Sequence, residues 1–162
     1  TMPTPPAIHQ VIKQNLDYLF RFAFFRTGNR ADAEDIVHNA CLRLLDRDLD
    51  GISPESLRMY LFKTTLNLCR SHLRDIATLP LDGIDPPDTA GEDAELQAEH
   101  ERIHALLVSL PDREREAILM RAVDGLSFAE IGRVLDLAPT TVQYRYASGM
   151  NRLRHNISPS KQ

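Results

Sequence analysis

A capped helix start, a sharp turn and a second helix follow one another within residues 127–154, and this pattern constrains the fold most. Ser127 and Glu130 form a capping box, in which the hydroxyl accepts from the backbone three residues on and the carboxylate reaches back. Asp136 tolerates the left-handed backbone that ends a helix, and Pro139 suits the first turn of the next. The sequence therefore predicts a helix of about nine residues, a turn, and a longer helix that begins at Pro139.

Each helix of this pair has an apolar face. The first face consists of Phe128, Ile131, Val134 and Leu135, with Gly132 as a small residue for close helix crossing. The second face consists of Val142, Tyr146, Gly149 and Leu153. The outward face of the second helix carries hydroxyl, amide and guanidinium groups, on Thr140, Thr141, Gln143, Tyr144, Arg145, Ser148 and Arg152. This arrangement is typical of a DNA-reading helix-turn-helix. A plain helical hairpin with a solvated face is the alternative.

Three further helices are expected before residue 77, because apolar residues recur there at helical spacing. The first ends near Gly28, the second has its last apolar residue at Leu45, and the third runs from about Pro54 to Ile76. The residues expected on their buried faces include Leu16, Leu45, Leu57, Tyr60, Thr65 and Leu73. We therefore expect an all-α protein.

The charges separate the chain into parts. Residues 1–76 contain 10 basic and 9 acidic residues, and residues 102–162 contain 9 basic and 6 acidic ones. Residues 77–101 contain 8 acidic residues and no Lys or Arg, so the formal charge of −4 comes from the middle of the chain. The low net charge therefore does not exclude a nucleic-acid partner for either end.

Three prolines, Pro80, Pro86 and Pro87, together with two glycines, mark the acidic stretch as a connector. We expect helicity to resume near Asp93. The expected organisation is two small helical domains over residues 7–76 and 94–156, joined by an acidic, flexible linker over 77–93. A solvated spacer is the favoured interpretation of its acidity, and mimicry of RNA is the alternative.

Several function classes find no support in the sequence. No apolar run reaches the roughly 18 residues of a membrane span, and no secretory signal precedes the first helix, so we expect a cytoplasmic protein without membrane insertion. Cys41 and Cys69 fall on apolar helix faces, which favours buried reduced thiols over a disulfide. His100 and His104 share a helix face, but two ligands alone make a poor metal site, and we expect no metal and no cofactor. No nucleotide loop, nucleophile elbow or zinc-binding helix is present, which argues against an enzyme.

The stretch LPDREREAILMRAVDGLSFAEIGRVLDLAPTTVQYRY resembles the promoter-distal domain of the extracytoplasmic-function (ECF) sigma factors of bacterial RNA polymerase. The stretches RTGNRADAEDIVHNACLRLL and SLRMYLFKTTLNLCRSHLRD resemble the other domain of the same family, in the same order along the chain. The family usually has glycine at Asp136, basic residues at Gln143 and Ser148, and glutamine at His38.

The resemblance implies a transcription initiation factor that binds core RNA polymerase, recognises the minus-10 and minus-35 promoter elements and aids strand opening. It implies polymerase binding by the second helix, at Asp35, His38, Asn39 and Arg43. It implies minus-10 DNA binding by the third helix and its preceding loop, at Asp48, Ser53, Ser56, Tyr60, Phe62, Lys63, Asn67, Arg70, Ser71 and Arg74. It implies minus-35 DNA binding by the outward residues of the last helix, Thr140, Thr141, Gln143, Tyr144, Arg145, Ser148 and Arg152.

The expected controller of such a factor is an anti-sigma protein. One alternative is a sigma mimic, which binds an anti-sigma factor without promoter activity, because Arg145 is the only Lys or Arg between Pro139 and Asn151. A second alternative is an ordinary repressor or activator that uses the helix-turn-helix alone. That alternative leaves the first domain unexplained.

Overall fold

The computed structural model describes residues 6–79 and 93–157, and every regular element in these two ranges is helical. The all-α prediction is thereby confirmed. The chain divides into two compact units, Thr1–Ala94 and Glu95–Gln162. Most of the predicted linker, residues 80–92, lies outside the described residues, and helicity resumes at Asp93 as expected.

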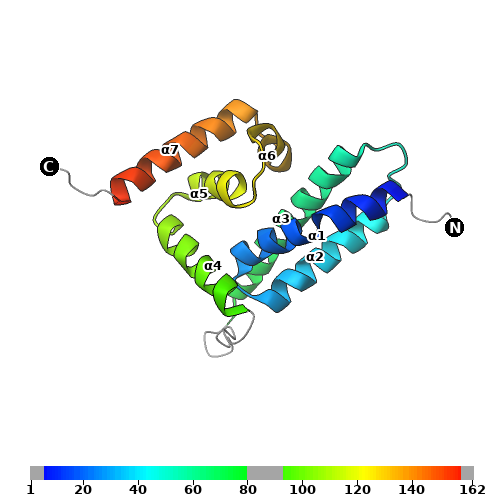
Figure 1. Ribbon diagram of the computed structural model, residues 1–162, viewed down its shortest axis with the longest axis horizontal. Coiled ribbons are helices and arrows are strands. Elements are labelled where there is room, and N and C mark those ends of the chain that lie inside the picture. Colours follow the sequence, from blue (N-terminus) through cyan, green and yellow to red (C-terminus); the bar gives the residue numbers. More distant parts are fainter. Residues whose placement is uncertain (1–5, 80–92, 158–162) are drawn as a thin grey trace. The chain divides into compact units, whose positions relative to one another are not determined.

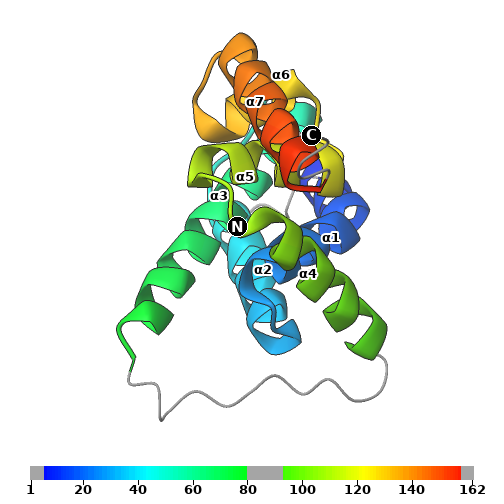
Figure 2. The ribbon, with the colours of Figure 1, turned by 90° about the vertical axis from the view of Figure 1, so that its left-hand side faces the viewer.

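The first unit consists of α1 (Pro6–Thr27), α2 (Arg30–Leu45) and α3 (Pro54–Ala77), each in contact with the other two (Figures 1 and 2). Gly28 adopts a φ of +69° and donates its backbone N–H to the Phe24 carbonyl at 2.8 Å, which ends α1. The next residue, Asn29, caps α2 by accepting from the Asp32 backbone at 3.0 Å. The chain therefore turns sharply at Gly28 and Asn29, and α2 packs against α1.

The core of this unit is aromatic where α1 meets α3. Phe22 and Phe62 are fully buried, and their rings meet edge to face with centroids 5.4 Å apart. Asn15 is also buried; it donates to the Val11 carbonyl at 2.7 Å and accepts from Arg58 Nε at 3.0 Å. The buried amide of Asn15 is thus satisfied by groups from both helices.

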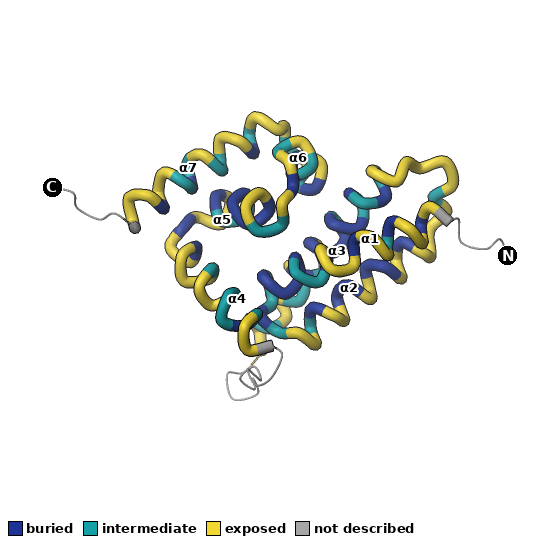
Figure 3. Tube along the Cα trace, in the orientation of Figure 1, coloured by how far each residue is buried: buried dark blue, intermediate teal, exposed yellow. Residues whose placement is uncertain are grey.

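The expected buried faces need correction in two places. Met59, Phe62 and Leu66 are buried although they were not expected on the inner face of α3, because both α1 and α2 pack on that helix. Leu16, Leu45 and Leu73 were expected inside but are 43%, 40% and 42% exposed. Figure 3 shows this alternation of buried and exposed segments along the helices of the unit.

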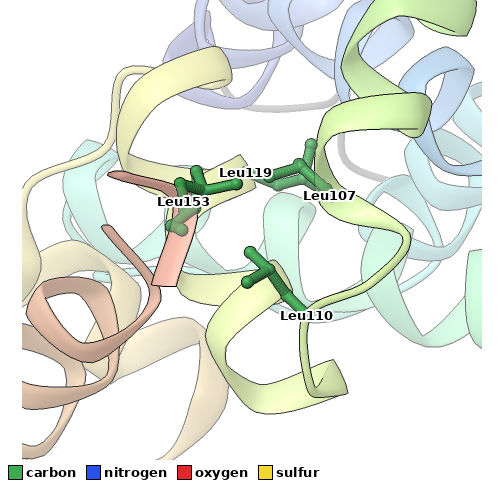
Figure 4. Packing of buried hydrophobic residues seen from close by; sticks show 5 residues of the cluster. Leu107, Leu110, Leu119 and Leu153 are labelled. Atoms are coloured by element: carbon green, nitrogen blue, oxygen red, sulfur yellow. The ribbon is translucent and has the colours of Figure 1, made fainter. Parts of the chain in front are cut away.

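The second unit contains α4 (Asp93–Leu107), α5 (Asp112–Ile118), α6 (Phe128–Leu135) and α7 (Pro139–Ile157), with a π-helical turn, Leu119–Val123, after α5. A leucine-rich cluster joins the ends of α4 and α7 to α5 and the turn that follows (Figure 4). The buried members of this cluster are Leu107, Leu110, Ile118, Leu119 and Leu153. Because α5 and α7 share this cluster, α7 is held along its length rather than only at the turn that precedes it.

Arg115 fixes the link between α4 and α5. Its guanidinium donates to the carbonyls of Leu107 at 3.2 Å and Leu110 at 2.9 Å, and it pairs with Asp112 at 3.0 Å. The Leu107 carbonyl also accepts from the Leu110 N–H at 3.0 Å, and Leu110 itself lies in the link between the two helices. After α5 the chain widens into the π-helical turn, where the Asp124 N–H reaches the Leu119 carbonyl five residues back at 2.9 Å.

Both cysteines are free thiols in the interior of the first unit, as expected. Burial raises the pKa of the Cys41 thiol, so that this group stays protonated and weakly reactive at neutral pH.

Candidate nucleic-acid interface

The α6–α7 pair forms the helix-turn-helix that the sequence predicts. The Ser127 hydroxyl accepts from the Glu130 N–H at 3.1 Å, while the Glu130 carboxylate accepts from the Ser127 N–H at 2.9 Å. Asp136 ends α6 with φ +58° and ψ +46°, in the left-handed region. Both predictions, the capping box and the left-handed aspartate, are confirmed.

Gly132 permits the tight turn between the two helices, although for a different reason from the one expected. A Cβ on Gly132 would lie 2.5 Å from the carbonyl oxygen of Leu137, which belongs to the turn rather than to α7. The Leu137 N–H in turn donates to the Gly132 carbonyl at 2.8 Å. The close approach is therefore between α6 and the turn, and it requires a residue without a side chain.

The N-terminal half of α7 presents the polar face that the sequence predicts. Val142 and Gly149 are buried on the opposite face, Leu153 is buried near the C-terminal end, and Tyr146 is half-buried. Tyr144 is 74% exposed. Thr140 and Gln143 are exposed, while Thr141 and Arg145 are half-buried. This half of the helix offers hydroxyl, amide and guanidinium groups of the kinds that read base edges in a major groove.

The C-terminal half of the same face is already engaged within the protein. Ser148 donates its hydroxyl to Glu114 Oε1 on α5 at 2.5 Å. Arg152 donates from Nε to the same oxygen at 3.0 Å, and its Nε lies 2.9 Å from Oε2. Glu114 is buried, whereas the Arg152 side chain remains 59% exposed. The other nitrogen atoms of Arg152 thus remain available to a partner, while the Ser148 hydroxyl proton is used.

These contacts set the charge of Glu114. The hydrogen bond from Ser148, together with the hydrogen bond and positive charge of Arg152, lowers the pKa of Glu114 below its usual value, even though burial acts in the opposite direction. Glu114 is therefore ionised at neutral pH. Glu114 was not among the site residues predicted from the sequence, because its partners lie 34 and 38 residues further along the chain.

The four residues of α2 for which polymerase binding was expected are exposed: Asp35, His38, Asn39 and Arg43. The opposite face of the helix, with Ala33, Val37 and Leu44 among its residues, is buried in the first unit. The nearby Asp32 differs from this set, because it pairs with His72 Nε2 on α3 at 3.1 Å. The exposed row could therefore contact another protein without disturbing the packing of α2.

On α3, the three residues Asn67, Arg70 and Arg74 are exposed along one side of the helix. Lys63 and Ser71 are half-buried. Two guanidinium groups and an amide in such a row suit a nucleic-acid strand, whose phosphates and base edges need donors at repeated intervals.

Two aromatic residues of α3 differ in their environments. Phe62 is fully buried against Phe22, so it is a core residue and its ring presents no face to solvent; its expected contact with DNA does not fit this position. Tyr60 is half-buried, and the Arg47 guanidinium lies 5.2 Å from its ring centroid. Only Tyr60 of the pair has the exposure that base stacking needs.

The polar side chains of the loop before α3 form hydrogen bonds within the loop and with the first turn of α3. Ser53 caps α3 by accepting from the Ser56 N–H at 3.2 Å, and the two hydroxyls lie 3.1 Å apart. The Asp48 carboxylate accepts from the Asp50 N–H at 3.4 Å. Gly51 adopts a φ of +80° in the same loop. Of the expected site residues here, Asp48 and Ser53 are exposed in the loop, and Ser56 is half-buried in the first turn of α3.

A polar cleft of about 530 Å³ lies between the end of α2 and the middle of α3. It is lined by Arg43, Asp46, Arg47, Tyr60, Lys63, Thr64 and Asn67. The structure thereby brings Arg43, for which polymerase binding was expected, together with three residues for which DNA binding was expected. Arg47, two residues beyond the end of α2, was not predicted as a site residue, although its spacing of four residues from Arg43 is a signal that could have identified it.

The two histidines of α4 stack on one another, with ring centroids 6.0 Å apart. Within the described ranges, no group of three or more His, Cys, Asp or Glu residues is placed to hold a metal ion. The described helices also include none that is long and apolar enough to span a membrane.

A capped helix-turn-helix in one unit and a polar row on α3 in the other define a helical DNA-binding protein. Residues 11–78 match the family described as Sigma-70 region 2, and residues 100–153 match Sigma-70, region 4. The chain is 28% identical, over 94% of its length, to the ECF RNA polymerase sigma factor SigE of Mycolicibacterium smegmatis, and it spans 62% of that protein. The chain belongs to the sigma-70 family, among the ECF sigma factors.

Solved structures share this fold. A structure of CnrH in complex with the cytosolic domain of CnrY aligns with a TM-score of 0.70 and 23% identity, covering 94% of this chain and 89% of the other. The sigma factor RpoE of Bartonella quintana, in complex with the anti-sigma factor NepR, aligns with a TM-score of 0.55 and 21% identity, covering 92% and 97% of the two chains. These likenesses concern the fold.

Proposed function

We propose that the protein is a transcription initiation factor, which binds core RNA polymerase, directs it to promoters and assists strand opening. The observation that carries the proposal is the presence of both sigma-70 regions, in order, on a chain whose exposed polar rows lie on the matched helices. The protein acts in the cytoplasm, where RNA polymerase works.

The first unit has two tasks in this proposal. The exposed row of α2, with Asp35, His38 and Asn39, contacts the polymerase. The α3 row, with Arg70 and Arg74 as its strongest cations, binds the minus-10 element as a single strand. Guanidinium groups suit the second task because they pair with phosphate and stack on unpaired bases.

The second unit binds the minus-35 element through the N-terminal half of α7. Gln143, Tyr144 and Arg145 face solvent in whole or in part, and Thr140 and Thr141 lie in the first turn, where helix-turn-helix proteins contact bases. Arg152 contributes at most a contact with a DNA phosphate, because its Nε already donates a hydrogen bond to Glu114.

An anti-sigma protein is the proposed regulator. RpoE of Bartonella quintana was solved in complex with such a partner, NepR, and the shared fold supports a similar partner here. The domain organisation that we propose follows the expected boundaries, 7–76 and 94–156, with a linker over 77–93. These boundaries agree with the matched segments 11–78 and 100–153 to within about six residues at each end.

Run-off transcription with purified core polymerase tests the proposal. The expected result is a specific transcript that requires the protein, from a promoter selected out of a random DNA library by the assembled holoenzyme. A sigma mimic would bind an anti-sigma partner and yield no transcript. A repressor that uses only the helix-turn-helix would bind duplex DNA without associating with core polymerase.

A further inference from the structure

The end of α3 that carries the two arginines of the α3 row has little apolar packing. The eight buried residues of this helix all lie at or before Cys69, and none of residues 70–77 is buried. Leu73 is 42% exposed, and Ile76 is half-buried. Helix ends without packing fray, so the last two turns of α3 need another contact to keep a fixed direction.

His72 supplies such a contact. Its Nε2 lies 3.1 Å from Oδ2 of Asp32, which is in the first turn of α2. A carboxylate only accepts hydrogen bonds, so the imidazole donates from Nε2. Of the side chains from 70 to 77, that of His72 alone forms a hydrogen bond or an ion pair with another helix in the part of the chain that the structure describes. The end of α3 is therefore held to α2 through this bond.

Asp32 is itself fixed at the corner between α1 and α2. Its backbone N–H donates to the side chain of Asn29 at 3.0 Å, which caps α2. The residue before that cap, Gly28, ends α1 by donating to the Phe24 carbonyl. The side chains of Asp32 and His72 are 37% and 27% exposed, so their bond is partly shielded from water and stronger than one on an open surface. Asp32 is thus a fixed acceptor for the end of α3.

The position of His72 along α3 also determines where the two arginines point. An α-helix turns by about 100° per residue, so side chains two residues apart point roughly 200° away from one another. Arg70 and Arg74 lie two residues before and two residues after His72. Because His72 points to α2, both guanidinium groups point to the opposite side, and both arginines are exposed. A rotation of this helix end about its axis would move the two arginines together.

We propose that His72 is a positioning residue of the strand-binding surface, because its bond to Asp32 sets the direction of the two arginines. The imidazole itself does not touch the strand. The inference rests on the proposed binding of the opened promoter strand by α3. Two rival explanations are a direct contact between His72 and the DNA, and a role in the stability of the whole unit.

The first experiment measures amide hydrogen exchange in the free protein. His72→Leu has no donor and should speed exchange over residues 70–77 by about tenfold, which corresponds to the loss of one hydrogen bond to a charged group. Exchange in the buried middle of α3 should not change. His72→Gln, whose amide nitrogen can still donate to Asp32, should restore most of the protection. His9→Leu, at an exposed position of α1, is the control. Unchanged exchange in His72→Leu would show that another contact holds the helix end, and would overturn the proposal.

The second experiment titrates the assembled holoenzyme with a fluorescent single strand taken from the minus-10 element of the selected promoter. His72→Leu and Asp32→Ala should each weaken strand binding by about three- to tenfold, while the affinity for core polymerase stays the same. The double variant should be no weaker than either single variant, because both substitutions remove the same bond. His72→Gln should recover strand binding. Glu95→Ala, at an exposed position of α4, is the control for the loss of a carboxylate.

The outcomes separate this inference from the function on which it rests. If wild-type holoenzyme binds no single strand, the proposed function fails and the inference fails with it. If wild type binds the strand and the His72 variants equal it, the inference alone is refuted. Additive losses in the double variant would indicate a direct contact between His72 and the strand. Equal losses of strand binding and polymerase binding would indicate a role in the stability of the unit, and either result overturns the proposal.

Discussion

The hydroxyl of Ser148 on α7 donates a 2.5 Å hydrogen bond to the buried carboxylate of Glu114 on α5. Arg152, one turn further along α7, donates to the same oxygen. The two contacts divide α7 into an N-terminal half whose polar groups face solvent and a C-terminal half that is anchored to the unit. The orientation of the reading half is thus set by a charged group on another helix.

Glu114 should make the second unit sensitive to acid. Its pKa is lowered in the folded state, so the unfolded chain takes up the proton more readily. The contribution to stability is therefore complete above the ordinary glutamate pKa of 4.5 and declines as pH falls through the lower folded-state pKa. Thermal unfolding followed by circular dichroism between pH 3 and pH 7 should show a melting temperature that drops at the acidic end.

The Glu114→Gln variant should melt lower at neutral pH and lose part of this acid dependence, because the amide does not titrate. Glu95→Gln, at an exposed position of α4, is the control and should follow the wild-type pH curve. An unchanged acid dependence in Glu114→Gln would show that other carboxylates account for it.

Asp35→Arg should weaken binding of core polymerase. Reversal of one charge in a desolvated interface typically costs about 2–5 kcal/mol, and Asp35 is exposed on α2, where the substitution leaves the helix packing intact. Fluorescence titration with labelled core enzyme would measure the loss, and circular dichroism would confirm the fold. The control reversal is Lys13→Glu on α1. Equal affinity of the folded Asp35→Arg protein and wild type would remove α2 from the interface.

Arg70→Ala and Arg74→Ala together should impair strand opening more than polymerase binding. Both residues are exposed on α3 and supply the guanidinium groups of its row. Permanganate reactivity of promoter thymines reports opening directly, and the amount of assembled holoenzyme reports binding. Arg102→Ala, at an exposed position of α4, serves as the basic control. Full reactivity in the double variant would mean that another surface opens the DNA.

Arg145→Ala should relax base choice in the upstream promoter element. An arginine that reads guanine contributes about 1–3 kcal/mol of discrimination, whereas one on phosphate adds affinity without base preference. Transcription from a promoter with the element should therefore drop, and transcription from a template without it should change little. An equal proportional loss on both templates would contradict base reading by Arg145.

Phe62→Ala should reduce stability rather than act on DNA selectively. Removal of a fully buried phenylalanine costs about 3–5 kcal/mol, and Phe62 packs against Phe22 in the core. Urea unfolding would measure that loss. Phe62→Leu, which retains most of the volume, should recover much of the stability and bind single strands as wild type does. Weak strand binding by a stable Phe62→Leu protein would restore a DNA role for this ring.

The parts of the fold that the sequence predicted depend on local interactions. Ser127 and Glu130 are three residues apart, and the left-handed turn at Asp136 depends on that residue and its neighbours, so pattern alone was sufficient. The caps at Asn29 and Ser53 were not among the predictions, although they are equally local, because each side chain accepts from a backbone N–H three residues further on. Such features need no knowledge of what packs on the other side.

The misjudged residues depend on partners far along the chain. Phe62 lies on a helix that two others cover, so helical spacing alone did not show which faces were buried. In the sequence, Glu114 is one charged residue among several acidic and basic ones. Only its contact with α7 in the structure shows that it is buried. The π-helical turn at Leu119–Val123 has no distinct hydrophobic period that would predict it.

Asp136 also has a consequence for the unfolded chain. A glycine in the turn would adopt the φ of +58° without strain, but it would leave the unfolded peptide more conformations to lose on folding. Aspartate has the opposite effects: it adds some backbone strain in the folded turn, and it lowers the conformational entropy of the unfolded chain. Asp136 therefore affects the stability of the turn between α6 and α7 through the unfolded chain as well as through the folded one.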